Sequence, residues 1–126
     1  MYYSRILLID DDEDDQELFA AAIRQVAASV QCTVTESAQT ALRMLGSREI
    51  EVDLIFLDLN MPVMSGQQFL TEKNRRTELS NIPVIVLSTS SNADIIAKTT
   101  ALGVRQFVTK PNSFTELKRI LFDILK

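Results

Sequence analysis

The chain has 126 residues, 46% of them hydrophobic and 24% charged, with a net charge of -4. This composition is typical of one folded globular domain and excludes a disordered chain. The acidic balance gives no electrostatic footprint for nucleic acid or for an anionic membrane surface. No apolar run approaches the ~20 residues of a membrane span. Neither nucleic acid nor a membrane is therefore an expected partner.

Two residue counts restrict the chemistry. There is no histidine, which excludes Ser-His-Asp and Cys-His catalysis and removes the commonest zinc ligand. The single cysteine, Cys32, cannot form an internal disulfide, and a reducing cytosol is its expected environment. We therefore expect a cytoplasmic protein.

Strands and helices alternate in the first part of the chain. Residues 5–9 form an apolar run without polar alternation, which is typical of a parallel strand buried on both faces. Apolar residues then share one helical face over 18–26. The run 32–36 alternates apolar and polar residues, which predicts an edge strand. A second helix follows over 38–45, with Gly46 as its stop.

The middle of the chain continues the same pattern. Residues 53–57 are a third apolar run and predict a third strand. A helix is predicted to begin near Ser65 and Gly66 and to fade before Leu79. The next apolar run, 84–87, follows directly after a proline and predicts a fourth, buried strand.

The last part of the chain adds one strand and two helices. A helical pattern over 95–102 precedes the fifth run, 105–109. The final helix has apolar residues on one face over 114–124, with Ser113 as its N-cap and Glu116 completing a capping box. The order is thus strand then helix, five times. It predicts an α/β fold, a doubly wound parallel sheet with helices on both faces.

Polar residues follow four of the predicted strands. Asp10 and Asp11 follow the first strand, Asp58 the third, Ser88 the fourth and Lys110 the fifth. Two strand orders are common in such sheets, and in both the ligand crevice lies beyond the carboxyl ends of the strands. In the flavodoxin-like order 2-1-3-4-5 the first and third strands are adjacent, so the three aspartates converge.

Three ionised carboxylates in one crevice repel one another. At a separation of ~4 Å and an effective dielectric constant of ~20, each pair costs about 4 kcal/mol. Such a cluster either raises a pKa or binds a cation. Oxygen ligands without His or Cys favour a hard cation, Mg2+ before Ca2+, and Mg2+ favours phosphate oxygens. We therefore predict phosphoryl chemistry at this rim of the sheet.

The residue types at the rim suit such chemistry. Asp58 is the natural nucleophile, because aspartyl phosphates are established covalent intermediates. Lys110 can neutralise one phosphoryl oxygen, and the hydroxyl of Ser88 can donate a hydrogen bond to another. Attack by a carboxylate needs no general base, which agrees with the missing histidine.

Four segments resemble the signatures of the receiver domains of bacterial two-component response regulators, in the same order and at the same spacing. They are ILLIDDD, DLIFLDLNMPVMSG, IPVIVLSTS and FVTKP. The resemblance implies a flavodoxin-like (βα)5 sheet of strand order 2-1-3-4-5 over residues 1–126, as one receiver domain without an output domain. It implies that Asp58 accepts a phosphoryl group from a sensor histidine kinase or a histidine phosphotransfer protein, in a Mg2+-dependent reaction.

The resemblance also implies roles for individual residues. The implied Mg2+ ligands are Asp10, Asp11, Asp58 and the backbone carbonyl of Asn60. Ser88 would be the hydroxyl switch, where Thr is frequent in the family, and Lys110 would pair with the phosphate. Phe107 would be an aromatic rotamer switch, where Tyr is frequent. The peptide bond between Lys110 and Pro111 would be cis.

The resemblance implies partners as well. The face made by the predicted fourth helix, fifth strand and fifth helix would contact a downstream protein, and the oligomeric state is open. The acidic residues 12–15 favour the N-terminus of the first helix through its dipole. They also resemble the acidic run of some stand-alone receivers, including those that serve phytochrome-type kinases.

Other function classes stay open at this stage. A Mg2+-dependent phosphohydrolase could use an aspartyl-phosphate intermediate, but such enzymes carry a second Asp where this chain has Asn60. An interaction domain independent of phosphorylation could keep the fold, although retention of all the rim residues argues against it. Nucleotide or flavin binding is disfavoured, because the chain has neither a GxGxxG nor a P-loop motif. We expect no enzyme activity beyond slow self-dephosphorylation.

Overall fold

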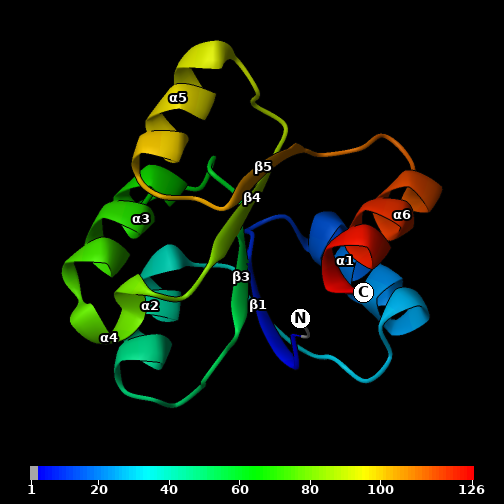
Figure 1. Ribbon diagram of the computed structural model, residues 1–126, viewed down its shortest axis with the longest axis horizontal. Coiled ribbons are helices and arrows are strands. Elements are labelled where there is room, and N and C mark those ends of the chain that lie inside the picture. Colours follow the sequence, from blue (N-terminus) through cyan, green and yellow to red (C-terminus); the bar gives the residue numbers. More distant parts are fainter. Residues whose placement is uncertain (1–2) are drawn as a thin grey trace.

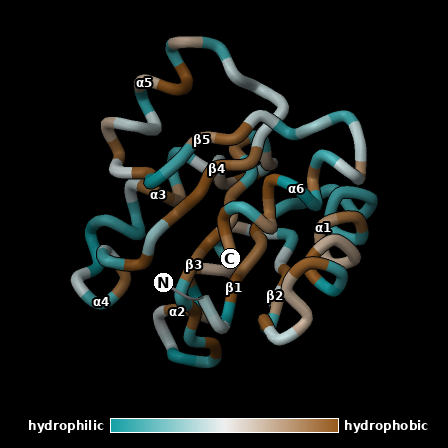
Figure 2. The backbone as a smooth tube through the Cα atoms, turned by 45° about the vertical axis from the view of Figure 1, so that its right-hand side comes forward, coloured by the Kyte–Doolittle hydropathy of each residue, from teal (hydrophilic) through white to brown (hydrophobic). Residues whose placement is uncertain are grey.

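The computed structural model describes residues 3–126. Its centre is a five-stranded parallel sheet in the order β2-β1-β3-β4-β5, as the flavodoxin-like prediction requires (Figures 1 and 2). The strands are β1 (Arg5–Ile9), β2 (Gln31–Thr35), β3 (Leu54–Leu57), β4 (Val84–Ser88) and β5 (Gln106–Thr109). Because β1 pairs directly with β3, the residues that follow these two strands lie next to each other.

Helices connect the strands and cover both faces of the sheet. They are α1 (Glu13–Val26), α2 (Ala38–Gly46), α3 (Gly66–Arg75), α4 (Thr77–Ser80), α5 (Ala93–Ala101) and α6 (Phe114–Leu125). The sequence does not predict α4, because four residues are too few to show a helical period. The predicted fourth and fifth helices are therefore α5 and α6. None of the helices in the described part of the chain has the length and apolar character needed to cross a bilayer.

Each face of the sheet has its own hydrophobic core. Successive residues of a strand point to opposite faces, so Ile6 and Leu8 pack with α1 and α6, while Leu7 and Ile9 pack with α2 and α3. In Figure 1, α1 and α6 lie on one side of the sheet and the other helices lie on the opposite side. Figure 2 shows that the central strands are hydrophobic along most of their length. Burial on both faces explains why these strands lack polar alternation.

The strand β2 lies at an edge of the sheet, as its alternating sequence predicts. Most of its residues are half-buried, whereas β3 and β4 are buried throughout. The predicted site residues instead follow the other four strands, β1, β3, β4 and β5.

Side chains cap the helices that follow the rim. Ser65 begins α3 with a capping box: its hydroxyl accepts from the Gln68 amide at 3.2 Å, and the Gln68 side chain accepts from the Ser65 amide at 2.8 Å. Ser113 caps α6 as predicted, accepting from the Glu116 amide at 3.1 Å. The predicted box at Ser113 is only half formed, because the Glu116 carboxylate pairs with Arg119 instead.

Candidate functional site

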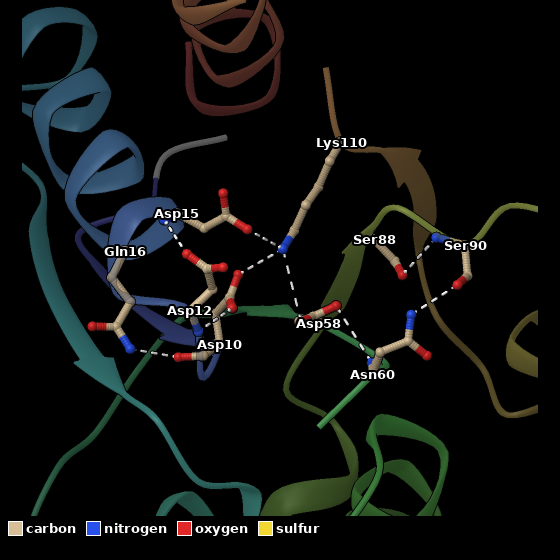
Figure 3. Close-up of polar contacts among 9 residues, drawn as sticks. All are labelled: Asp10, Asp12, Asp15, Gln16, Asp58, Asn60, Ser88, Ser90 and Lys110. Carbon is tan, nitrogen blue, oxygen red and sulfur yellow. Dashed lines mark hydrogen bonds and ion pairs between the residues drawn. The ribbon is translucent and has the colours of Figure 1, made fainter. Parts of the chain in front are cut away.

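The sheet itself brings the predicted site residues to one rim. Backbone hydrogen bonds continue past the strand ends: the Asp58 amide donates to the Ile9 carbonyl at 2.9 Å, and the Lys110 amide donates to the Ser88 carbonyl at 2.9 Å. Figure 3 shows the carboxylates of Asp10 and Asp58 and the ammonium of Lys110 pointing toward one another. Residues that lie up to 100 positions apart in sequence, Asp10 and Lys110, therefore meet at the carboxyl end of the sheet.

Three carboxylates gather at this rim. Asp10, Asp11 and Asp58 each offer one oxygen, and these oxygens lie within 4.8 Å of one another. Asp10 and Asp58 are only 1% and 6% exposed, whereas Asp11 is open to solvent. Oxygen donors this close, with one side open to water, fit a hard divalent cation such as Mg2+, which keeps several of its waters. The carboxylate cluster expected from the sequence is therefore present.

Burial of two of these carboxylates opposes their ionisation. It raises the pKa of Asp10 above its ordinary value, and hydrogen bonds from the Asp12 amide and from Lys110 offset this only in part. Burial likewise raises the pKa of Asp58, where Lys110 acts in the opposite direction and Asp10 adds to the increase. A bound cation would relieve the same repulsion and favour the ionised forms.

Lys110 brings a positively charged ammonium to the rim, and its side chain is 13% exposed. Its Nζ lies 2.6 Å from Asp15 Oδ2, 2.9 Å from Asp10 Oδ2 and 3.8 Å from Asp58 Oδ2. Burial alone would lower the pKa of Lys110, but the hydrogen bonds to Asp15 and Asp10 outweigh it and the pKa is raised. The ammonium is therefore held in its charged form, beside the carboxylate predicted to be the nucleophile.

Polar side chains complete the rim on the side of β4. Ser88 is fully buried, and its hydroxyl accepts from the Ser90 amide at 3.2 Å. The side-chain amide of Asn60 donates to the Ser90 hydroxyl at 2.7 Å, and the Asn60 backbone amide donates to Asp58 Oδ1 at 3.4 Å. Asn60 and Ser90 thus join the loops after β3 and β4 directly beside Asp58 (Figure 3).

Comparison with known proteins shows which family the chain belongs to. The family model of the response regulator receiver domain matches residues 6–122, which is most of the chain. The chain belongs to the response regulator receiver family.

Two solved receivers are similar to this chain over nearly its whole length. The phosphorylated cyanobacterial phytochrome response regulator RcpA is 31% identical, with a TM-score of 0.87 over 97% of this chain and 91% of RcpA. The Mn2+-bound response regulator Rcp1 is 28% identical, with a TM-score of 0.84 over 96% of this chain and 91% of Rcp1.

Curated relatives differ in how much of their length this receiver spans. The transcriptional regulatory protein MalR of Bacillus subtilis is 34% identical over 118 residues, which are 94% of this chain but 48% of MalR. The two-component response regulator ORR12 of Oryza sativa subsp. japonica is 31% identical over 121 residues, 96% of this chain and 98% of ORR12. The chain therefore spans about half of one relative and nearly the whole of the other.

One residue-level prediction is wrong. Over residues 3–126 of the receiver there is no cis peptide bond, so the bond between Lys110 and Pro111 is trans rather than cis. A bond that precedes proline favours trans intrinsically, by about 0.5–1 kcal/mol. With the trans bond, Lys110 already reaches both Asp10 and Asp15. The lysine therefore occupies its predicted place at the rim without the predicted isomer.

Three predicted roles stay predictions. Phe107 is half-buried on β5 and packs against the core that contains Leu57 and Val86, which suits a core side chain as well as a rotamer switch. Ser88 lies buried at the rim, and its role as the hydroxyl switch stays a prediction. The role of the Asn60 backbone carbonyl as a metal ligand also stays a prediction.

Sequence reasoning misses one contact of the receiver site. The acidic run 12–15 is expected only to favour the helix N-terminus, and Asp12 does cap α1, accepting from the Asp15 amide at 2.9 Å. The Asp15 carboxylate, however, turns to the rim and binds Lys110. The contact depends on how α1 is rotated relative to β5, and no short motif encodes that rotation.

A close backbone approach fixes the loop after Asp58. The Gly66 amide donates to the Leu59 carbonyl at 3.0 Å. A Cβ at Gly66 would lie 2.8 Å from the Asp58 carbonyl oxygen and 2.7 Å from Leu59 Cδ2, so it would push α3 away from the strand end. We expect Gly66→Ala to lower the free energy of unfolding by about 1–3 kcal/mol in urea denaturation.

Gly46 provides the matched control for that variant. A Cβ there would meet only the flexible side chain of Arg76, at 3.1 Å, and alanine has the better helix propensity. We expect Gly46→Ala to leave the free energy of unfolding unchanged or to raise it by up to about 1 kcal/mol. Equal losses in the two variants would show that the approach at Gly66 does not matter.

Proposed function

We propose that Asp58 accepts a phosphoryl group from the phosphohistidine of a sensor histidine kinase or a histidine phosphotransfer protein. The reaction depends on Mg2+, and it switches a surface that binds a downstream protein. The observation that supports this proposal best is the rim itself: a buried carboxylate, Asp58, with two further carboxylates within 4.8 Å and the Lys110 ammonium at 3.8 Å. Membership of the receiver family supports the same chemistry.

We infer that the chain's own groups carry out an in-line transfer. An oxygen of Asp58 attacks phosphorus, the bond from phosphorus to the imidazole nitrogen of the donor breaks, and its electron pair stays on the imidazole. Lys110 neutralises charge on a phosphoryl oxygen, and the hydroxyl of Ser88 donates to another once it rotates toward the group. Mg2+ held by Asp10, Asp11 and Asp58 would supply positive charge against the incoming phosphoryl oxygens.

The phosphoryl group carries a charge of about -1.5 to -2, in place of the single negative charge of the ionised Asp58 carboxylate. Ser88 moves toward it, the loop after β4 follows, and Phe107 turns inward. The α5–β5–α6 face is the expected output surface, because β5 ends at the rim and the loop before α5 begins there. The downstream partner is a protein that distinguishes the two states of this face.

The receiver is proposed to be a switch and not a hydrolytic enzyme. Asn60 occupies the place where an aspartyl-phosphate hydrolase would need an acid or base, and its amide is engaged with Ser90. Slow self-hydrolysis of the aspartyl phosphate is the only turnover expected. A cytoplasmic location is part of the proposal, and it agrees with the free Cys32, whose pKa burial raises to about 11.

Intact-mass spectrometry tests the proposal. The protein is incubated with acetyl phosphate and Mg2+, beside an EDTA control and the Asp58→Asn variant. We expect one added phosphoryl group in the wild type and none in either control. A folded wild type that neither gains mass nor binds beryllofluoride would contradict the proposed function, and an adduct that persists in Asp58→Asn would contradict the assigned acceptor.

A further inference from the structure

The ammonium of Lys110 lies at unequal distances from the carboxylates around it. Its shortest contact, 2.6 Å, is to Asp15, while its distance to Asp58 is 3.8 Å (Figure 3). Asp15 does not belong to the cluster of carboxylates that could hold a cation, which consists of Asp10, Asp11 and Asp58. Among the hydrogen bonds and ion pairs of the described residues, its carboxylate contacts the rim through Lys110.

The donors of Lys110 are limited in number. An ammonium has three N–H donors. One is given to Asp10 and one to Asp15, which leaves a single donor for the side of the rim where Asp58 lies. A phosphoryl group on Asp58 brings three strong acceptor oxygens to that side. The phosphoryl oxygens and the Asp15 carboxylate thus compete for the same cation.

Burial decides which contact Lys110 gives up. The Asp10 side chain is 2% exposed, so separating it from Lys110 would leave a buried carboxylate without its cation. The Asp15 side chain is 38% exposed, and water can replace the ammonium there at small cost. The contact with Asp15 is therefore the one that a phosphoryl group displaces.

The surroundings leave room for this exchange. A cavity of about 100 Å³ touches both Asp15 and Lys110 and is otherwise lined mostly by apolar side chains between α1 and α6, Phe19 and Phe114 among them. On this side Lys110 therefore borders open space as well as packed side chains.

On the basis of the proposed function, we infer that Asp15 is a positioning residue that holds Lys110 in a resting place and opposes its pairing with a phosphoryl group on Asp58. The contact between Asp15 and Lys110 stabilises the unphosphorylated state relative to the phosphorylated one. Removing the Asp15 carboxylate frees the lysine and shifts the equilibrium toward the phosphorylated state. Asp15 thereby sets how strongly the receiver holds its phosphoryl group.

Beryllofluoride, which stands in for the phosphoryl group on a carboxylate, gives an equilibrium test. Its dissociation constant is measured by calorimetry at saturating Mg2+, so that any change in Mg2+ affinity is removed from the comparison. We expect Asp15→Asn and Asp15→Ala to bind beryllofluoride about two- to fivefold more tightly than the wild type, the range for loss of one partly exposed ion pair. Asp15→Glu restores a carboxylate and should return the affinity toward that of the wild type.

Asp14→Asn is the matched control. Asp14 is the exposed neighbour of Asp15 in the first turn of α1 and has no contact with Lys110 among the ion pairs of the described residues. The variant removes one negative charge from the same helical turn without breaking a contact with Lys110, so it reports the effect of the lost charge without the lost contact. Equal affinities for Asp14→Asn and Asp15→Asn, or weaker binding by Asp15→Asn, would overturn the inference while wild-type binding upholds the proposed function. A folded wild type that binds no beryllofluoride would overturn both.

Discussion

Replacing Lys110 with methionine is expected to lower the free energy of unfolding by about 2–4 kcal/mol and to slow phosphorylation by acetyl phosphate by about 100-fold or more. Methionine keeps the length and volume of the aliphatic stem but removes the ammonium. Asp10 and Asp58 then remain buried without the cation that faces them at 2.9 and 3.8 Å. The stability loss lies toward the lower end for a buried pair, because Asp15 can turn to solvent.

Urea unfolding followed by circular dichroism measures the first effect, since the chain has no tryptophan. Intact-mass spectrometry over time measures the second. Lys98→Met is the control: Lys98 forms an exposed pair with Asp94 at 3.8 Å, and such pairs contribute about 0–1 kcal/mol. Similar losses in the two lysine variants would mean that Lys110 is an ordinary surface lysine. Unchanged phosphorylation would remove it from the proposed mechanism.

Asp58→Asn is expected to abolish phosphorylation and yet to stabilise the metal-free protein at neutral pH. Burial raises the pKa of Asp58, so the folded state binds a proton at this carboxyl more tightly than the unfolded state does. The group's contribution to stability is then fully present below its ordinary pKa of 3.8 and is lost as the pH rises through the raised value. The amide has no such loss, so the advantage of the variant should grow with pH.

Thermal unfolding in EDTA, from about pH 3.5 to about pH 7, measures this difference. At neutral pH we expect the Tm of Asp58→Asn to exceed that of the wild type by about 3–6 °C, the shift that about 1 kcal/mol produces in a domain of this size. Near the acid end the two Tm values should converge. Adding Mg2+ should raise the wild-type Tm and have a smaller effect on the variant, because Asp58 is one of the implied ligands.

Asp53→Asn supplies a control of opposite sign. The amides of Ser4 and Arg5 donate to the Asp53 carboxylate at 2.9 Å and lower its pKa. Its contribution to stability is present above its ordinary pKa and is lost as the pH falls through the lowered value. Asp53→Asn should therefore lose stability at neutral pH, where Asp58→Asn gains it. A wild-type Tm that is indifferent to both Mg2+ and Asp58→Asn would show that the carboxylate cluster does not form as described.

Much of this fold is predictable because the pattern of polar and apolar residues in each strand reflects how many of its faces are buried. The runs at β1, β3 and β4 lack polar alternation because helices cover both of their faces, and the alternation at β2 follows from its place at the edge. Once the strand order is known, parallel strands place Asp10, Asp58, Ser88 and Lys110 at one rim. The site therefore follows from the topology together with residue type.

The features that the sequence does not predict depend on details beyond strand order. The four residues of α4 are too few for a period to be visible. The contact between Asp15 and Lys110 joins residues 95 positions apart and depends on the rotation of α1. Glu116 has two available partners, the Ser113 amide and Arg119, and only packing and solvation decide between them.

The central claim, that Asp58 itself accepts the phosphoryl group, is tested most directly by locating the modified residue. After phosphorylation by acetyl phosphate and Mg2+, borohydride reduces an aspartyl phosphate to homoserine, which peptide mass spectrometry places in the sequence. We predict homoserine at position 58 alone, and none when EDTA is present. Homoserine at Asp10 or Asp11, with Asp58 unmodified, would contradict the account.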